Sequence, residues 1–354
     1  MIETLEDLER HLEAAVQLEL SVIPPYLCAL YTLQPGANEE VSQIIRSVVV
    51  EEMLHMILAA NVLNAVDGRL RMTDPGFVPT YPTYLPDGNE SFLVHLLPFS
   101  PEAVETFLKI EEPSYEPPPA AMESLAKTAA AKPPVPLRLA ELGPYETVGD
   151  FYKAIIKGIE HLVDKLGERE VFQGNPERQI PPEIYYYAGG GQPIAVHDLR
   201  SAKAAMEQIV DQGEGETCSM YDGDGDLAHY FRFMEIKYGR RYEPGQRQGL
   251  ALSLSEVPRG EPFPVSYEAV YPMLRDPRTG DYPAGELRQA SLAVDAAYSH
   301  LIRQLQSAFD GRKDLLLPAV GTMFELKYKA LELLKNPLPG QPGVNAGPAF
   351  EYVP

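Results

Sequence analysis

Two acidic residues and a histidine interrupt an apolar stretch of sequence that begins at Val48. Glu52 and His55 are three residues apart and share a periodic face with Val48, so a helix here would turn both side chains toward the core. Glu19 falls in the same way between the apolar residues of the preceding periodic segment. A buried carboxylate without a partner is strongly unfavourable, so these three side chains are expected to interact with one another or with a bound cation.

Glu19 and Glu52 lie equally far along the chain from Pro35 and Gly36, where the sequence "QPGANEE" predicts a turn. In an antiparallel helical hairpin the two glutamates would therefore meet. A glutamate from one helix and a Glu-x-x-His pair from the next form half of a carboxylate-bridged di-metal site for iron or manganese. Glu51 remains an alternative to Glu52 as the ligand, or a solvated neighbour.

A second pair of periodic segments, "DLRSAKAAMEQIVDQGEG" and "GDLAHYFRFMEIKYG", is expected to supply the other half of this site. Asp226 and His229 repeat the spacing of three residues. On the preceding segment Glu207 and Glu214 are seven residues apart and share a face. Glu214 is favoured because it and His229 are equally distant from the middle of the intervening loop, and Glu207 is the alternative. This site would lie nearer its turn than Glu19 does, so the two hairpins would be staggered.

The other motifs in the sequence give weaker evidence of a functional site. His161 is expected at the surface or the edge of the core, and the remaining histidines show no metal-ligand spacing. The sequence "DGDGD" at 222–226 resembles the start of an EF-hand, but Leu227 and Phe233 replace the required glycine and glutamate. The sequence contains no Walker A motif, no nucleophile elbow and no dinucleotide fingerprint.

Three aromatic residues close to the candidate ligands could shape a substrate pocket. Tyr26 follows Glu19 by two helical turns, and Tyr230 and Phe233 follow His229 directly and after one turn. We expect these side chains to line the space beside the metals. Ordinary core packing is the alternative for all three.

The remaining elements predict an all-α protein with long proline-rich loops. Apolar periodicity indicates a helix over about 5–33 and a second helix that follows the turn at 34–40 and runs to about 67. It also indicates a short helix after Ser100, one over "ETVGDFYKAIIKGIEHLVDKLG", and two C-terminal helices within about 286–336. The prolines of "PPY" should kink the first helix. Irregular insertions are expected at about 69–145 and 239–286. We therefore predict a single domain over 1–354 in which hairpins at about 5–67 and 198–238 form a bundle.

Composition restricts the partners. Acidic residues number 51 and basic residues 30, giving a formal charge of −21 that opposes binding to nucleic acid or to an anionic membrane. The N-terminal segment lacks the pattern of a signal peptide, and no apolar run has the length of a membrane span, so a cytoplasmic location is expected. Cys28 and Cys218 do not make a disulfide framework.

In these features the sequence resembles the ferritin-like domain family related to iminophenyl-pyruvate dimer synthase, an enzyme type of violacein and rebeccamycin biosynthesis. The resemblance rests on "LELSVIPPYLCALYTL", "VVVEEMLHMILAANVLNAVDG", "VPTYPTYLP", "HLLPFSPEAVETFLKIEEP", "TVGDFYKAIIKGI", "IVDQGEGE", "LAHYFRFMEI" and "AGPAFEY". It implies a ferritin-like four-helix bundle and, as ligands, Glu19, Glu52, His55, Glu214 and His229. Asp226 departs from the pattern if glutamate is preferred there.

The resemblance also implies oxidative chemistry on amino-acid-derived metabolites in natural-product biosynthesis. We therefore expect an O2-dependent di-iron oxidase or oxygenase that holds two iron ions, with manganese as the alternative metal. Its expected partners are O2 and a small-molecule substrate, and a homodimer is left open. A helical metal-binding or small-molecule-binding protein without turnover is the alternative function. Iron storage is disfavoured because long proline-rich insertions fit poorly into a close-packed cage.

Overall fold

The computed structural model describes residues 2–114, 142, 145–186, 190–215, 219–243, 246 and 257–354. Within these ranges the regular structure is helical, and β-structure is limited to isolated bridges such as that between Leu33 and Val270. The helices are α1 (Leu5–Thr32), α2 (Glu39–Ala65), α3 (Pro101–Ile110), α5 (Val148–Leu166), α6 (Glu168–Val171), α7 (Leu199–Glu214), α8 (His229–Tyr238), α9 (Glu286–Phe309) and α10 (Leu316–Leu333). The predicted all-α class is confirmed. Cys218 and most of the insertion after Ser114 lie outside the described residues.

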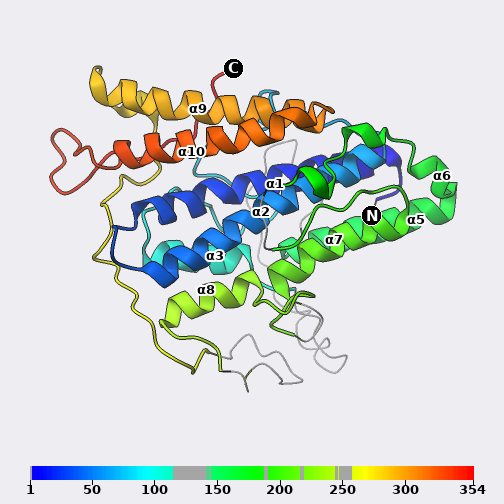
Figure 1. Cartoon of the computed structure of the whole chain (residues 1–354), viewed down its shortest axis with the longest axis horizontal. Helices are drawn as coiled ribbons and strands as arrows, with labels where there is room; N and C mark the ends of the chain where they lie inside the picture. Colours follow the sequence, from blue (N-terminus) through cyan, green and yellow to red (C-terminus); the bar gives the residue numbers. More distant parts are fainter. Residues whose placement is uncertain are drawn as a thin grey trace.

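The hairpin of α1 and α2 forms the central layer of the molecule (Figure 1). The Thr4 side chain caps α1 by accepting a hydrogen bond from the Asp7 amide. The helix continues through both of its prolines, although Pro25 has no N–H to donate to the carbonyl of Ser21. The hydroxyl of Tyr81 donates to that carbonyl instead, at 2.8 Å. A side chain from the crossover segment thus satisfies the backbone where the proline interrupts the helix.

Two interrupted helices pack against this hairpin and complete a four-helix bundle. In Figure 1, α3 and α5 follow one another along α1, while α7 and α8 follow one another along α2. Residues 198–238 therefore do not form the expected side-by-side hairpin, because α7 packs chiefly on α5 and α8 on α3. Both interruptions lie near the middle of the bundle. Four helix ends consequently face the midpoints of α1 and α2.

The caps define where these interrupted helices begin. Ser100 accepts a hydrogen bond from the Ala103 amide at the start of α3, and Thr147 accepts one from the Asp150 amide at the start of α5. Asp198 forms a capping box with Ser201 at the start of α7. The local sequence thus sets the helix starts independently of the rest of the bundle.

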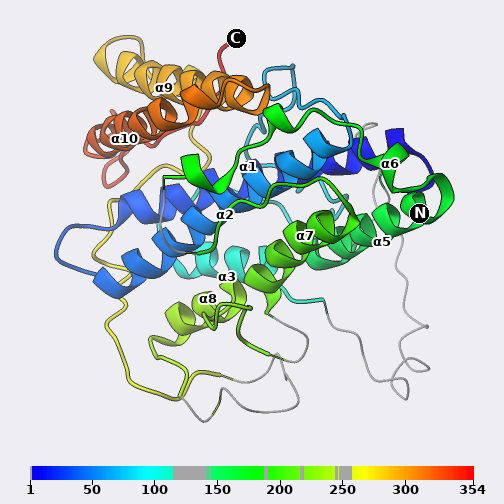
Figure 2. The same cartoon turned by 45° about the vertical axis from the view of Figure 1, so that its right-hand side comes forward.

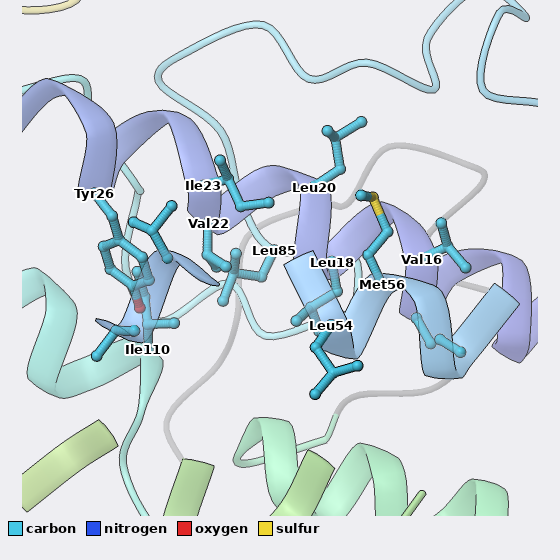
Figure 3. Packing of buried hydrophobic residues seen from close by; sticks show 14 of the residues in the cluster. Val16, Leu18, Leu20, Val22, Ile23, Tyr26, Leu54, Met56, Leu85 and Ile110 are labelled. Atoms are coloured by element: carbon cyan, nitrogen blue, oxygen red, sulfur yellow. The ribbon is translucent and has the colours of Figure 1, made fainter. Parts of the chain in front are cut away.

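A third layer, the hairpin of α9 and α10, covers the side of α1 and α2 that faces away from the interrupted helices (Figure 2). Figure 3 shows Leu20 and Met56 pointing to one side of the central layer, while Leu18, Leu54 and Tyr26 point to the other. The central hairpin is therefore buried on two faces. This burial explains why α1 and α2 reach the length and hydropathy of membrane-spanning helices, since 83% and 89% of their most apolar windows are buried inside the protein.

Candidate metal centre

Five buried side chains meet where the helix ends face the central layer. They form two overlapping groups, Glu19, Glu52 and His55 in the first and Glu52, Glu111 and His229 in the second. Within each group the possible ligand atoms lie within 4.8 Å of one another. Glu52 belongs to both groups, because one of its oxygens lies 3.2 Å from His55 Nδ1 and the other 3.0 Å from His229 Nδ1. Glu52 could therefore help to hold a metal ion in each of the two groups.

Both imidazoles present Nδ1 to the carboxylates and use Nε2 for a second partner. His55 Nε2 lies 2.8 Å from Oε1 of Gln212, whose amide nitrogen donates to the Gly190 carbonyl at 2.7 Å. His229 Nε2 lies 2.8 Å from Oε2 of Glu51. A partner that accepts from one ring nitrogen fixes the tautomer and turns the other nitrogen toward a metal. The two histidines are therefore oriented as metal ligands commonly are.

The two outer carboxylates are each held by a tyrosine. The Tyr152 hydroxyl donates to Glu19, and the Tyr26 hydroxyl donates to Glu111. Both tyrosines are fully buried, so water does not compete for these hydrogen bonds. Each group of ligands thus consists of the shared Glu52, one histidine with an oriented ring, and one glutamate held by a phenol.

Glu51 has a supporting position behind His229. Its second oxygen, Oε1, accepts a hydrogen bond of 2.8 Å from Arg232, and that guanidinium also donates to Ser47 Oγ at 3.0 Å. His229 and Arg232 hold the pKa of Glu51 below its usual value, against the effect of burial. Glu51 therefore neither replaces Glu52 nor lies in solvent. It neutralises Arg232 and orients the His229 ring.

Without a metal ion the centre must hold protons. Burial and the neighbouring Glu52 raise the pKa of Glu19 to about 8. Burial alone would lower the pKa of His55, but hydrogen bonds to Glu19 and Glu52 outweigh it and raise this pKa to about 10. Burial would raise the pKa of Glu52, but the charge of His229 outweighs it and holds this pKa well below its usual value. The site thus combines protonated imidazoles with at least one ionised carboxylate.

The surroundings of His229 Nδ1 favour a bound metal ion at this centre over protons alone. His229 Nδ1 is buried and has no hydrogen-bond partner of suitable geometry within the part of the chain that the structure describes. It nevertheless lies 3.0 Å from Glu52 and 3.4 Å from Glu111. When the His229 ring gives up its second proton and Nε2 keeps the proton that Glu51 accepts, Nδ1 presents a lone pair toward carboxylate oxygens. A metal ion between these atoms would satisfy all of them.

Glu111 is the residue that sequence reasoning missed. It lies one residue beyond α3, where its backbone N–H still bonds to the Phe107 carbonyl. A signal was present in the sequence, because Val104, Phe107, Leu108 and Glu111 step by three and four residues along one face. Gln212 carries the same signal on α7, one turn after the buried Ile209.

Glu214 occupies a different place from the predicted one. Its carboxylate accepts hydrogen bonds from Ser114, at 2.7 Å from the hydroxyl and 3.1 Å from the amide, and pairs with Lys153 at 3.2 Å. Gln212 faces the centre, and a residue two positions further on is rotated by about 200° around the helix. Glu207, the alternative, is exposed. In the described structure neither glutamate belongs to the two ligand groups, and Gln212 is the residue of α7 that contacts them.

Asp226 also lies outside the ligand groups. It is exposed, and its backbone closes a turn with Asp222 through hydrogen bonds of 2.9 Å in both directions. Helix α8 begins at His229, so the spacing of three residues is not a helical spacing here. The predicted helix does not extend back to Asp226, because "DGDG" forms a turn that continues through this residue.

The aromatic residues predicted for a substrate pocket have other positions. Tyr26 and Phe233 pack with Phe107 in a tilted and edge-to-face cluster, with ring centroids 4.6–5.4 Å apart. Tyr230 is half-buried on the outer side of α8 and packs edge-on against Phe231. None of the three predicted residues lines the small cavity beside the ligands, which is bordered by Tyr152, Ile209 and Val148 instead.

That cavity has a volume of about 30 Å³, which is room for roughly two water molecules. Besides Glu19, Glu52, His55 and Glu111, its wall includes Gly149 and Gly213. A side chain at Gly149 would collide with the Glu214 carboxylate, since a Cβ there would lie 1.1 Å from Oε1. Molecules the size of O2 fit beside the ligands, whereas a larger substrate exceeds this volume.

Comparisons with known proteins agree with this architecture. The Ferritin-like family model matches residues 12–238, a range that holds all five candidate ligands, and the chain belongs to this family. It is 25% identical to dichlorochromopyrrolate synthase of Lentzea aerocolonigenes, in an alignment that covers 99% of this chain and 36% of that enzyme. The chain thus spans about a third of the length of that relative. The crystal structure of a ferritin-like protein from Caulobacter vibrioides has the same fold, with a TM-score of 0.63, 22% identity and 99% of each chain covered.

Proposed function

We propose that this protein is an O2-dependent di-iron oxidase or oxygenase that acts on an amino-acid-derived small molecule in natural-product biosynthesis. The observation that carries the proposal is the pair of ligand groups that share Glu52. The similarity to dichlorochromopyrrolate synthase supports a biosynthetic substrate. Two iron ions, or manganese in their place, would supply the redox chemistry when bound between these residues.

The composition of the ligand set favours reaction over storage of metal. Related di-metal proteins commonly use four carboxylates and two histidines, whereas this centre has three glutamates and two histidines. Fewer protein ligands leave coordination positions for O2 or substrate. The apolar wall of the cavity, formed by residues such as Leu18, Val22 and Ile209, keeps bulk water from the ligands.

The residues around the ligands have separate tasks. Gln212 and Glu51 hold the histidine rings, while Tyr152 and Tyr26 hold the outer glutamates and can exchange protons with them. The Ser114, Lys153 and Glu214 contacts close the approach to the cavity. Substrate entry is proposed to open these contacts. The expected location is the cytoplasm, with O2 and a small molecule as partners, no nucleic acid or membrane as a partner, and a homodimer as an open alternative to a monomer.

Oxygen consumption by iron-loaded protein distinguishes the candidate functions. Two ferrous ions hold two electrons, so without substrate each centre can consume at most about one O2. A panel of amino acids and their 2-oxo and 2-imino acids, each tested with and without an external electron donor, should contain compounds that sustain O2 consumption over many turnovers. The variant Glu52→Ala should abolish both the single and the repeated consumption. Consumption that stops after one turnover with every compound would support the alternative, a metal-binding protein without turnover, and no consumption at all would contradict redox function.

A further inference from the structure

A second cavity lies on the other side of the central layer, between the α1–α2 hairpin and the α9–α10 hairpin. Its volume is about 760 Å³, within the range of sites that bind small molecules. The wall consists mainly of apolar side chains, including Leu20 and Ile23 of α1, Met53 and Met56 of α2, and Ile302 and Met323 from the third layer. No residue of this wall belongs to the metal centre. The cavity is therefore separate from the site described above.

The inner wall includes a buried tyrosine. Tyr298 on α9 is only 3% exposed, and its ring packs edge-on against Phe350. Its hydroxyl is buried and has no hydrogen-bond partner among the residues that the structure describes, although the side chain lines the cavity. Because the hydroxyl oxygen is not accessible from the cavity, a bound molecule would contact the apolar part of the Tyr298 ring rather than this oxygen.

Two cationic side chains at the same cavity lack acidic partners. Arg46 of α2 is exposed and Lys327 of α10 is half-buried, and neither forms an ion pair within the described ranges. Glu39 is the acidic residue on this wall, and it precedes Arg46 by two helical turns, about 10 Å. In a chain with a formal charge of −21, two unpaired cations at the edge of an apolar cavity favour a ligand with an anionic end.

We propose that this cavity is a binding site for an elongated apolar carboxylate, such as a free long-chain fatty acid. The acyl chain lies along the wall formed by Leu20, Ile23 and Met56, and the carboxylate is attracted to Arg46 and Lys327. This site requires no metal ion and does not depend on the proposed oxidase function.

Calorimetric titration of the full-length, metal-free protein with dodecanoate tests the proposal. Saturable binding of one molecule per chain is expected. Affinity should fall from dodecanoate to octanoate by up to about fourfold for each methylene removed, as burial of an acyl chain requires. Dodecanol should bind more weakly than dodecanoate at low salt, and the difference should shrink as salt screens Arg46 and Lys327.

Substitutions in the wall of the cavity test whether dodecanoate binds there. Met323→Trp fills the cavity and should lower dodecanoate affinity by at least tenfold. The double variant R46Q and K327Q should lower it by about three- to tenfold. Arg69→Gln, which removes an exposed arginine away from the cavity, is the matched control and should leave affinity unchanged. Tyr298→Phe should leave dodecanoate binding intact, because the hydroxyl that it removes is not accessible from the cavity.

Iron loading and Glu52→Ala should leave dodecanoate binding unchanged, which separates this site from the metal centre. Failure of dodecanoate to bind would overturn the proposal. Binding that survives both Met323→Trp and the double charge variant would also overturn it. A concentration-dependent dimer that Met323→Trp disrupts, together with no dodecanoate binding, would assign the cavity to a second copy of the chain instead.

Discussion

Gln212 provides a direct test of how the centre is oriented. It is buried, and its carbonyl oxygen lies 2.8 Å from His55 Nε2. Gln212→Ala removes this acceptor without removing a ligand. Loss of such a supporting contact commonly lowers metal affinity about 10- to 100-fold, which corresponds to about 1.4–2.8 kcal/mol. A buried N–H of His55 would also be left unsatisfied, so the free energy of unfolding of the metal-free protein should fall by about 1–3 kcal/mol.

Anaerobic titration with ferrous iron against a competing chelator measures this effect. In Gln212→Ala one of the two binding steps should weaken, because only the group of Glu19, Glu52 and His55 depends on the His55 ring. Gln212→Glu keeps an acceptor and should retain affinity within a few-fold. Gln208→Ala, one turn earlier on α7, is the matched control. If Gln212→Ala binds both metal ions as tightly as the unchanged protein, the assignment of Gln212 as the residue that orients His55 is wrong.

Two further predictions follow from the same geometry. Glu214→Ala and Asp226→Ala should each retain two metal ions per chain by elemental analysis, since both carboxylates lie outside the ligand groups; loss of a metal from either variant would restore the original assignment. Iron affinity should increase by about tenfold or more per pH unit between pH 7 and 9, because metal must displace protons from Glu19, with a pKa of about 8, and His55, with a pKa of about 10. In the metal-free protein, protonated His55 stabilises the folded state; this contribution is complete below the ordinary histidine pKa of 6.5 and is lost as the pH rises through 10. Iron should therefore add most to the stability of the fold at alkaline pH. An affinity that does not change with pH would contradict this coupling.

The sequence was most informative where a helix is long and its apolar face continuous. Glu19, Glu52 and His55 lie on two such helices, and the distance of each glutamate from the turn at Pro35 was enough to predict that they meet. His229 was found because it begins the apolar face of α8. The prediction of an all-α bundle rested on the same regular spacing.

The sequence was least informative where helices end. Glu111 and Gln212 reach the centre from the last turns of α3 and α7, and their position depends on two interruptions that meet at the same level of the bundle. Local periodicity does not report that alignment, because it arises from packing between segments far apart in the chain. The prediction that Asp226 shares a helical face with His229 depends on a helix that begins before Asp226. A turn in the "DGDG" segment occupies that position, and α8 begins only at His229.

The central claim is that two metal ions are held by two groups of residues that share Glu52. Anomalous diffraction from crystals of the iron-loaded protein, together with the iron content of Glu111→Ala, tests it most directly. We expect two iron peaks on either side of the Glu52 carboxylate, one beside His55 and one beside His229, and a Glu111→Ala variant that keeps only the ion beside His55. A single peak, or iron bound at Glu214 or Asp226, would contradict it.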